Sequence, residues 1–78
     1  MVKIYTIAMC PYCTMAKRLL SERGYEFEEI NIENENISRD KLMEITGGRT
    51  VPQIIMNGKP IGGYENLRVL DMRGELLN

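Results

Sequence analysis

The two cysteines of this 78-residue chain, Cys10 and Cys13, are separated by only two residues. A disulfide between them closes too short a loop to stabilise a fold, because the effect of a cross-link grows with the length of chain enclosed. A complete zinc site normally takes four Cys or His ligands, and the chain has no histidine and no further cysteine. The sequence therefore predicts thiol-disulfide chemistry; the alternatives are two ordinary buried cysteines or half of a metal site shared between two chains.

A strand pattern precedes this pair and a helical pattern follows it. Successive side chains of residues 2–7 fall on alternate faces and many are β-branched, as in a strand. Pro11 suits the first turn of a helix that ends at Gly24. Apolar residues recur at helical spacing on one face: Tyr12, Ala16, Leu19 and Leu20. Cys10 is thus expected at the helix start, where amide N–H groups and the helix dipole stabilise a thiolate, with Cys13 deeper and less ready to ionise.

This placement assigns one role to each sulfur. The Cys10 thiolate attacks a substrate disulfide, and Cys13 or an outside thiol then resolves the mixed disulfide that forms. Such exchange requires no metal and no tightly bound organic cofactor.

The rest of the chain reads as an alternation of strands and helices. The order β-α-β-α-β-β-α predicts an α/β fold, with one four-stranded mixed sheet covered by helices on both faces, as a single domain over residues 1–78. The further elements are a strand at 26–32, a helix capped by Ser38 and ended by Gly47 and Gly48, a strand at 53–56, a hairpin turn at Asn57-Gly58 and a helix at 65–73.

The composition excludes several classes of partner. The chain has ten Lys and Arg residues and eleven Asp and Glu residues, which gives a net charge of −1. It therefore lacks the excess of positive charge that binding to nucleic acid or an anionic membrane requires. The apolar runs are far shorter than the roughly 20 residues that span a bilayer, and the first residues lack the apolar segment of a signal peptide. We expect a cytoplasmic monomer.

Three motifs together resemble the glutaredoxin family over nearly the whole chain. They are "CPYC" at 10–13, "TVPQI" at 50–54 and "IGG" at 61–63. The resemblance implies a thioredoxin-like fold and a glutathione-dependent oxidoreductase that reduces protein disulfides and glutathione mixed disulfides. Glutathione would be the co-substrate, and the partners would be disulfide-bonded or glutathionylated proteins, with ribonucleotide reductase as a candidate.

The resemblance also implies where glutathione binds. In the family the peptide bond before the "TVP" proline is cis, the preceding residue pairs with the backbone of the tripeptide, and amides after the glycines bind the γ-glutamyl carboxylate. An acidic side chain just after the glycines binds the ligand's amine. Carried onto this chain, these residues are Thr50, Val51, Pro52, Gly63, Tyr64 and Glu65.

Two further residues are expected near the ligand. Tyr12 is predicted to cover the sulfur and pack on glutathione, and Arg49 to pair with its glycyl carboxylate. The chain also departs from the family pattern, with Ile7 where many members have a lysine and Glu65 where an aspartate is usual. Ile7 favours, as an alternative, a redoxin that is reduced by thioredoxin reductase. A glutathione-bridged dimer carrying an iron-sulfur cluster through Cys10 is a lesser alternative.

Overall fold

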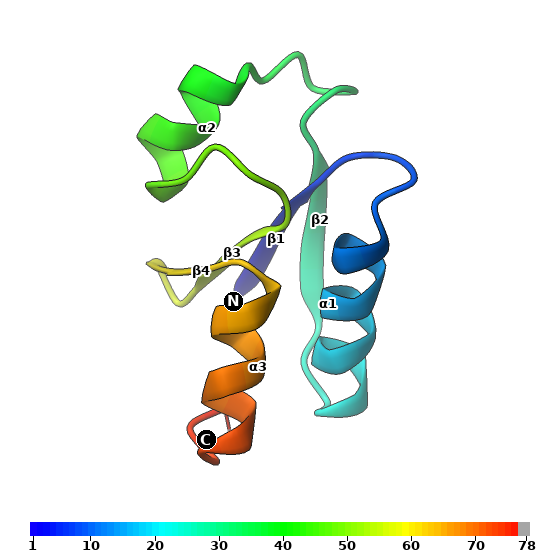
Figure 1. The fold of residues 1–78 in the computed structure, drawn as a ribbon, viewed down its shortest axis with the longest axis vertical. Coiled ribbons are helices and arrows are strands. Elements are labelled where there is room, and N and C mark those ends of the chain that lie inside the picture. The colour runs from blue at the N-terminus through cyan, green and yellow to red at the C-terminus, as the bar shows by residue number, and fades with distance from the viewer. Residues whose placement is uncertain (77–78) are drawn as a thin grey trace.

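The computed structural model describes residues 1–76, and within them the elements follow the predicted order (Figure 1). The predicted single domain over residues 1–78 extends two residues beyond this description. Most observed bounds lie within one residue of the predicted ones; Ile7, for example, falls outside the first strand. The bounds are β1 Val2–Thr6, α1 Pro11–Glu22, β2 Phe27–Asn31, α2 Arg39–Thr46, β3 Gln53–Met56, β4 Lys59–Gly62 and α3 Tyr64–Met72.

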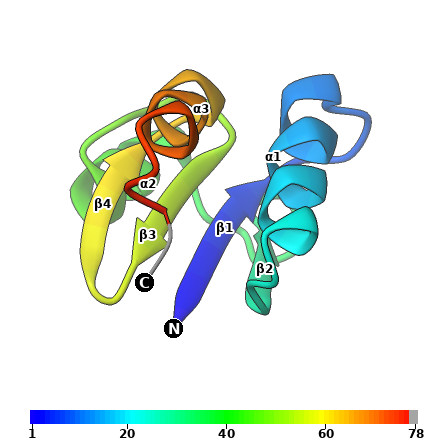
Figure 2. The same ribbon diagram turned by 90° about the horizontal axis from the view of Figure 1, so that it is seen from below.

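The four strands form one mixed sheet in the order β2-β1-β3-β4. Strand β1 pairs in parallel with β2 and antiparallel with β3, and the hairpin places β4 antiparallel to β3. Figure 2 shows these strands side by side, with α1 and α3 next to each other over the sheet. The predicted four-stranded mixed sheet is therefore confirmed.

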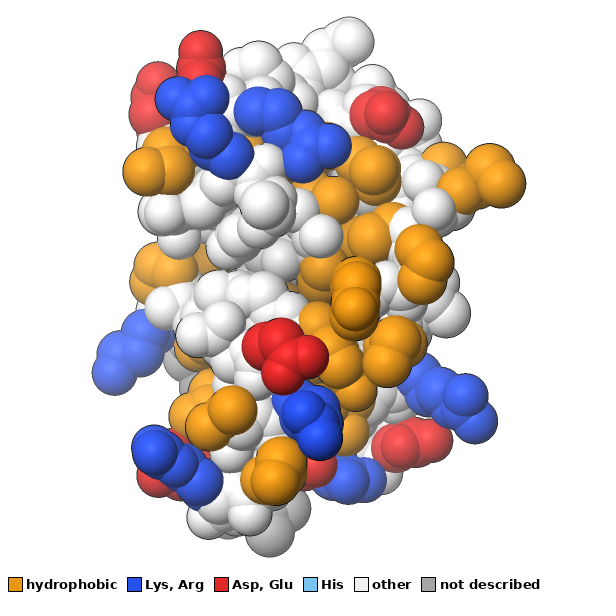
Figure 3. All heavy atoms as spheres, in the orientation of Figure 1, with side chains coloured by type: hydrophobic (Ala, Val, Ile, Leu, Met, Phe, Trp, Pro, Cys, Tyr) orange, Lys and Arg blue, Asp and Glu red, His pale blue; other side chains and the backbone are white. Residues whose placement is uncertain are grey.

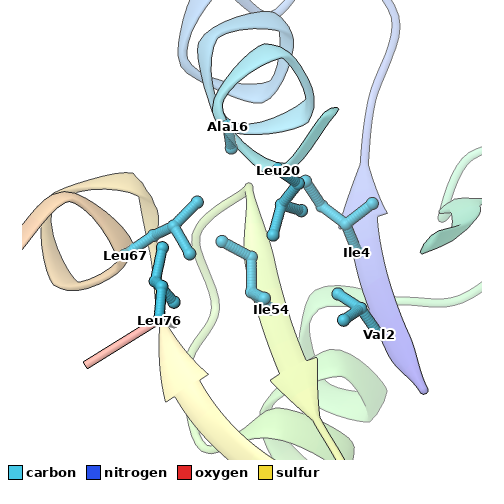
Figure 4. Packing of buried hydrophobic residues seen from close by; sticks show 7 residues of the cluster. All are labelled: Val2, Ile4, Ala16, Leu20, Ile54, Leu67 and Leu76. Atoms are coloured by element: carbon cyan, nitrogen blue, oxygen red, sulfur yellow. The ribbon is translucent and has the colours of Figure 1, made fainter. Parts of the chain in front are cut away.

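The larger core fills the space between the sheet and the two helices α1 and α3. Alternation along β1 turns Val2 and Ile4 toward this face, where β3 adds Ile54 from the middle of the sheet. Figure 4 shows these side chains pointing toward residues of both helices and of the chain beyond α3. The remaining members of the cluster are Ala16, Leu20, Leu67 and Leu76.

Helix α2 covers the opposite face of the sheet. Its Leu42 is fully buried against Tyr5 and Ile32, which point away from α1 and α3. The Ser38 Oγ accepts the Lys41 N–H at 3.0 Å at the start of this helix, as the sequence predicted. These contacts position the loop that leads from α2 to β3.

A bidentate ion pair joins the end of α1 to α3. Arg23 donates from Nε and Nη2 to the two carboxylate oxygens of Asp71, at 2.6 and 2.9 Å. The hydrogen bond from Arg23 and its charge lower the pKa of Asp71. A carboxyl group whose pKa is lowered by folding stabilises the fold above its unfolded pKa, and this contribution disappears as the pH falls through the folded value.

Asp71→Asn is therefore expected to lower the melting temperature at pH 7. The difference in melting temperature between the variant and the unmodified protein should decrease as the pH falls below about 4, where the carboxyl group of the unfolded chain takes up its proton. Thermal unfolding followed by circular dichroism across this range measures the effect. Glu44→Gln is a matched control, because Glu44 forms an exposed pair with Lys41 at 3.7 Å. A difference in melting temperature that does not depend on pH would contradict the lowered pKa of Asp71.

Within residues 1–76, the structure contains no helix with the length and apolar character needed to cross a membrane.

Candidate active site

Cys10 is the N-cap residue of α1, as the sequence predicted. Its backbone is extended, and its Sγ accepts the backbone N–H of Cys13 at 3.2 Å. The Cys10 carbonyl accepts the Thr14 N–H at 3.1 Å, which begins the regular hydrogen bonding of the helix. The sulfur thus lies where free amides and the helix dipole favour a negative charge.

Cys13 lies one turn further along α1 and is only 2% exposed, whereas Cys10 is half-buried. Both thiols are free. Burial raises the pKa of Cys13 to about 12, and the side-chain hydrogen bond with Cys10 and the Cys10 charge act in the same direction. The two sulfurs are therefore unequal: one is accessible at the helix start, and the other is held as a neutral thiol.

The surface around Cys10 is apolar. Met9 is 99% exposed and has a positive φ of 55°, an unusual backbone conformation for a non-glycine residue. Tyr12 and Met15 on α1 are also exposed. Figure 3 shows hydrophobic side chains gathered over α1 and the loop before it. The accessible sulfur is thus bordered by hydrophobic surface.

The first turns of α1 and α3 and the loop between α2 and β3 lie near one another at one end of the sheet (Figure 1). Residues of these segments line a groove. The rings of Tyr12 and Tyr64 meet across it, with their centres 6.0 Å apart. Seven of the eight residues predicted to contact glutathione line this groove: Tyr12, Thr50, Val51, Pro52, Gly63, Tyr64 and Glu65.

The floor of the groove is formed by close approach of two backbone segments. The Val51-Pro52 peptide bond is cis, as the resemblance implied. Gly63 is the N-cap of α3, and a Cβ at this position would lie 3.2 Å from the Pro52 carbonyl oxygen, closer than side chains usually come. No side chain of the described residues caps α3. The first amides of this helix are therefore free to bind an anion.

The eighth predicted residue, Arg49, is directed elsewhere. Its Nη1 lies 2.7 Å from Asp40 Oδ1 in an exposed ion pair, and Arg49 does not line the groove. Arg39 Nη1 donates to the Arg49 carbonyl at 2.8 Å, so a second guanidinium belongs to this loop. Arg39 was not predicted from the sequence, because nothing in the local pattern links the start of α2 to a residue ten positions later.

Asn66 was also missed and lines the groove next to Glu65. Its side chain lies against Gly62, where a Cβ would come within 2.8 Å of the Asn66 Cγ. The double glycine followed by a helix start was the available signal, because a small residue is needed where a helix side chain folds back on the preceding turn.

The fold and the site together define a class of protein. A mixed four-stranded sheet, a dithiol at the start of the first helix and a cis-proline loop beside it are the features of a thioredoxin-like redox protein. Residues 2–61 match the family model described as Glutaredoxin. The chain belongs to the glutaredoxin family.

Individual relatives agree with this assignment. Glutaredoxin 3 of Escherichia coli K12 is 44% identical over 75 residues, which cover 96% of this chain and 90% of that protein. The crystal structure of the holo form of glutaredoxin C1 from Populus tremula x tremuloides superposes with a TM-score of 0.89 at 30% identity, covering 97% of this chain and 78% of that one. A buckwheat glutaredoxin-glutathione complex gives 0.87 at 28% identity, covering 97% and 72%.

The predicted function class is thereby confirmed. The chain is a dithiol glutaredoxin with its two cysteines in Cys-X-X-Cys spacing, and glutaredoxins are glutathione-dependent disulfide oxidoreductases.

Proposed function

We propose that Cys10 is the nucleophile and Cys13 the resolving thiol of this oxidoreductase. The Cys10 thiolate attacks one sulfur of a substrate disulfide and forms a mixed disulfide, while the other sulfur leaves as a thiol after taking a proton. Cys13, or a glutathione molecule, then attacks Cys10 and releases the second thiol. The observation that carries this proposal is the Cys10 Sγ at the N-cap of α1, 3.2 Å from the Cys13 amide and two residues before Tyr12, which lines the groove.

The groove is proposed to bind the glutathione part of the substrate. The uncapped amides of α3 suit the γ-glutamyl carboxylate, and the backbone of Val51 suits pairing with the extended tripeptide. The structure of the related buckwheat protein is a complex with glutathione. The exposed ring of Tyr12 would pack on the ligand next to the sulfur.

The glycyl carboxylate needs a cation at the other end of the ligand. Arg49 is the proposed partner, although it would have to leave Asp40 to reach the ligand. Arg39 is near the same loop and is engaged there through a backbone carbonyl rather than a carboxylate. The two guanidiniums would together replace the cation that Ile7 does not supply.

Glu65 is proposed to pair with the ammonium of the γ-glutamyl group. Glu65→Gln should raise the KM for a glutathione mixed disulfide about tenfold with little change in kcat, because a charge-assisted hydrogen bond is lost while the sulfur chemistry is untouched. Steady-state kinetics with a glutathionylated peptide measure this. Glu44→Gln is the matched control: each glutamate is exposed and pairs three residues along its helix, Glu65 with Arg68 and Glu44 with Lys41. An unchanged KM would show that Glu65 does not bind the ligand and only places a negative charge at the start of α3.

The physiological setting is proposed from the glutaredoxin family to which the chain belongs. The protein would act as a cytoplasmic monomer, with disulfide-bonded or glutathionylated proteins, ribonucleotide reductase among the candidates, as its substrates. Glutathione would return electrons to the dithiol after each cycle.

A further inference from the structure

A polar cluster lies on the same face of the sheet as α1. Lys17 Nζ is 3.1 Å from Glu29 Oε2, and the Thr6 hydroxyl donates to the same oxygen at 2.8 Å. Thr6 follows the alternation of Val2 and Ile4 toward α1, and Glu29 pairs in register with Ile4 on the parallel strand β2. The cluster therefore connects α1 to the last residue of β1 and to the middle of β2.

Glu29 and Thr6 hold the Lys17 ammonium group in one position. Thr6 is fully buried, so its hydroxyl gives Glu29 a fixed partner. Glu29 accepts Lys17 with both oxygens, at 3.2 and 3.1 Å, and the hydrogen bonds from Thr6 and Lys17 lower the pKa of Glu29, with that from Thr6 the larger. Lys17 is thereby ordered along α1 instead of extending into solvent, and its side chain is 32% exposed.

This cation is four residues, or one helical turn, beyond Cys13. Residues i and i+4 lie on the same face of a helix, so Lys17 and Cys13 are one turn apart on the same face of α1. Among the described residues, the charged groups that act on Cys13 are Cys10, whose charge raises the pKa, and Lys17, whose charge lowers it; a backbone hydrogen bond with Ile7 also lowers it. Lys17 acts on Cys13 in this direction although it is paired with Glu29.

The balance around Cys13 changes during the reaction. In the reduced protein at pH 7, the Cys13 thiol, whose pKa is raised to about 12, is almost entirely protonated. Once Cys10 enters a mixed disulfide, its sulfur carries no charge, and the electrostatic effect by which it raises the pKa of Cys13 is lost. The positive charge of Lys17 then acts on Cys13 without opposition from the neighbouring sulfur.

We infer that Lys17, ordered by Glu29 and Thr6, is a positioning residue for the second half of the reaction, in which its ammonium stabilises the thiolate forming on Cys13. This inference rests on the proposed roles of the two cysteines. In the step, Cys13 loses its proton and its Sγ bonds to Cys10 Sγ. The bond from Cys10 to the substrate sulfur breaks, and that sulfur leaves with the electron pair and takes up a proton. One disulfide is consumed and one is formed.

The experiment separates the two halves of the reaction in time. The reduced protein is mixed in a stopped-flow instrument with dithiobis(nitrobenzoic acid), which releases one coloured thiolate when Cys10 attacks and a second when Cys13 resolves the mixed disulfide. The first phase depends on reagent concentration, and the second, being intramolecular, does not. The variants are Lys17→Met, which keeps the aliphatic chain, Lys17→Arg, which keeps the charge, and Arg18→Met as the matched control. Arg18 is on the same helix but is exposed and paired with Glu22.

Lys17→Met is expected to leave the first phase unchanged and to slow the second about three- to fivefold. Removing a nearby cation raises the pKa of Cys13 and lowers its thiolate fraction, while the higher nucleophilicity of the more basic thiolate restores part of the rate. The pH profile of the second phase should move to higher pH. Lys17→Arg and Arg18→Met should both stay within about twofold of the unmodified protein.

Other outcomes overturn the inference. An unchanged second phase in Lys17→Met, or equal slowing of both phases, would show that Lys17 has only a structural role. If Lys17→Arg slows the second phase as much as Lys17→Met does, the positive charge at residue 17 is not the cause of the effect. Failure of the proposed function looks different: the first phase would be missing from the unmodified protein, or the second would persist in Cys13→Ser.

Discussion

Cys10→Ser is expected to abolish both reduction of protein disulfides and removal of glutathione from mixed disulfides, by more than about a thousandfold. A serine hydroxyl at the N-cap of α1 still accepts an amide hydrogen bond, so the helix start is preserved. It does not form a thiolate or a disulfide, and the buried Cys13 cannot replace it. Both activities are measured by following NADPH consumption coupled through glutathione and glutathione reductase.

The circular dichroism spectrum and melting temperature of Cys10→Ser should match those of the unmodified protein, because the substitution is conservative at a half-buried cap position. Activity above one per cent in either assay would mean that another group starts the reaction.

Cys13→Ser should separate the two activities. Reduction of a protein disulfide is expected to fall at least about a hundredfold, because the mixed disulfide on Cys10 loses its intramolecular resolving thiol and with it the high effective concentration of a neighbouring group. Removal of glutathione should stay within a few-fold of the unmodified protein, since external glutathione can attack Cys10 directly. The amide of residue 13 still points at the Cys10 sulfur, because it belongs to the backbone.

The comparison uses two substrates in the same coupled assay: a peptide with one glutathionylated cysteine and a protein with a single accessible disulfide. Equal losses on both substrates would show that Cys13 has a role in the first step, and unchanged rates on both would make it a bystander.

Features set by neighbouring residues were predictable from the sequence. Ser38 caps α2 through an amide three residues away, and Cys10 caps α1 in the same way, so a short stretch of chain contains all the information. Gly47 ends α2 with a positive φ of 86°, which favours glycine at a helix end. Alternation of apolar residues in β1 likewise fixes which face each side chain occupies.

Features that join distant parts of the chain were not predictable in this way. Lys17 and Glu29 are twelve residues apart, and Thr6 and Glu29 are 23 apart, so their meeting follows from the parallel pairing of β1 with β2. The pairing of Arg49 with Asp40 depends on how α2 docks on the sheet. Even the groove lined by residues of the cis-proline loop and the start of α3 was expected from family motifs rather than from any pattern in this sequence alone.

Tyr12 shows the limit of periodicity most clearly. Helical spacing groups it with Ala16 and Leu20, which are fully buried, but Tyr12 is 57% exposed in the first turn of α1. Its placement beside Tyr64 agrees with the expectation that the ring contacts a ligand, which remains a prediction.

The central claim is the inequality of the two sulfurs, and alkylation tests it most directly. Each single-cysteine variant, Cys13→Ser and Cys10→Ser, is reacted with iodoacetamide at pH 7, and the adduct is followed by mass spectrometry. We predict that Cys10 is alkylated at least about a hundredfold faster than Cys13, because one sulfur is accessible at a helix start and the other is a buried thiol whose pKa is raised. Equal rates, or faster reaction at Cys13, would contradict the account.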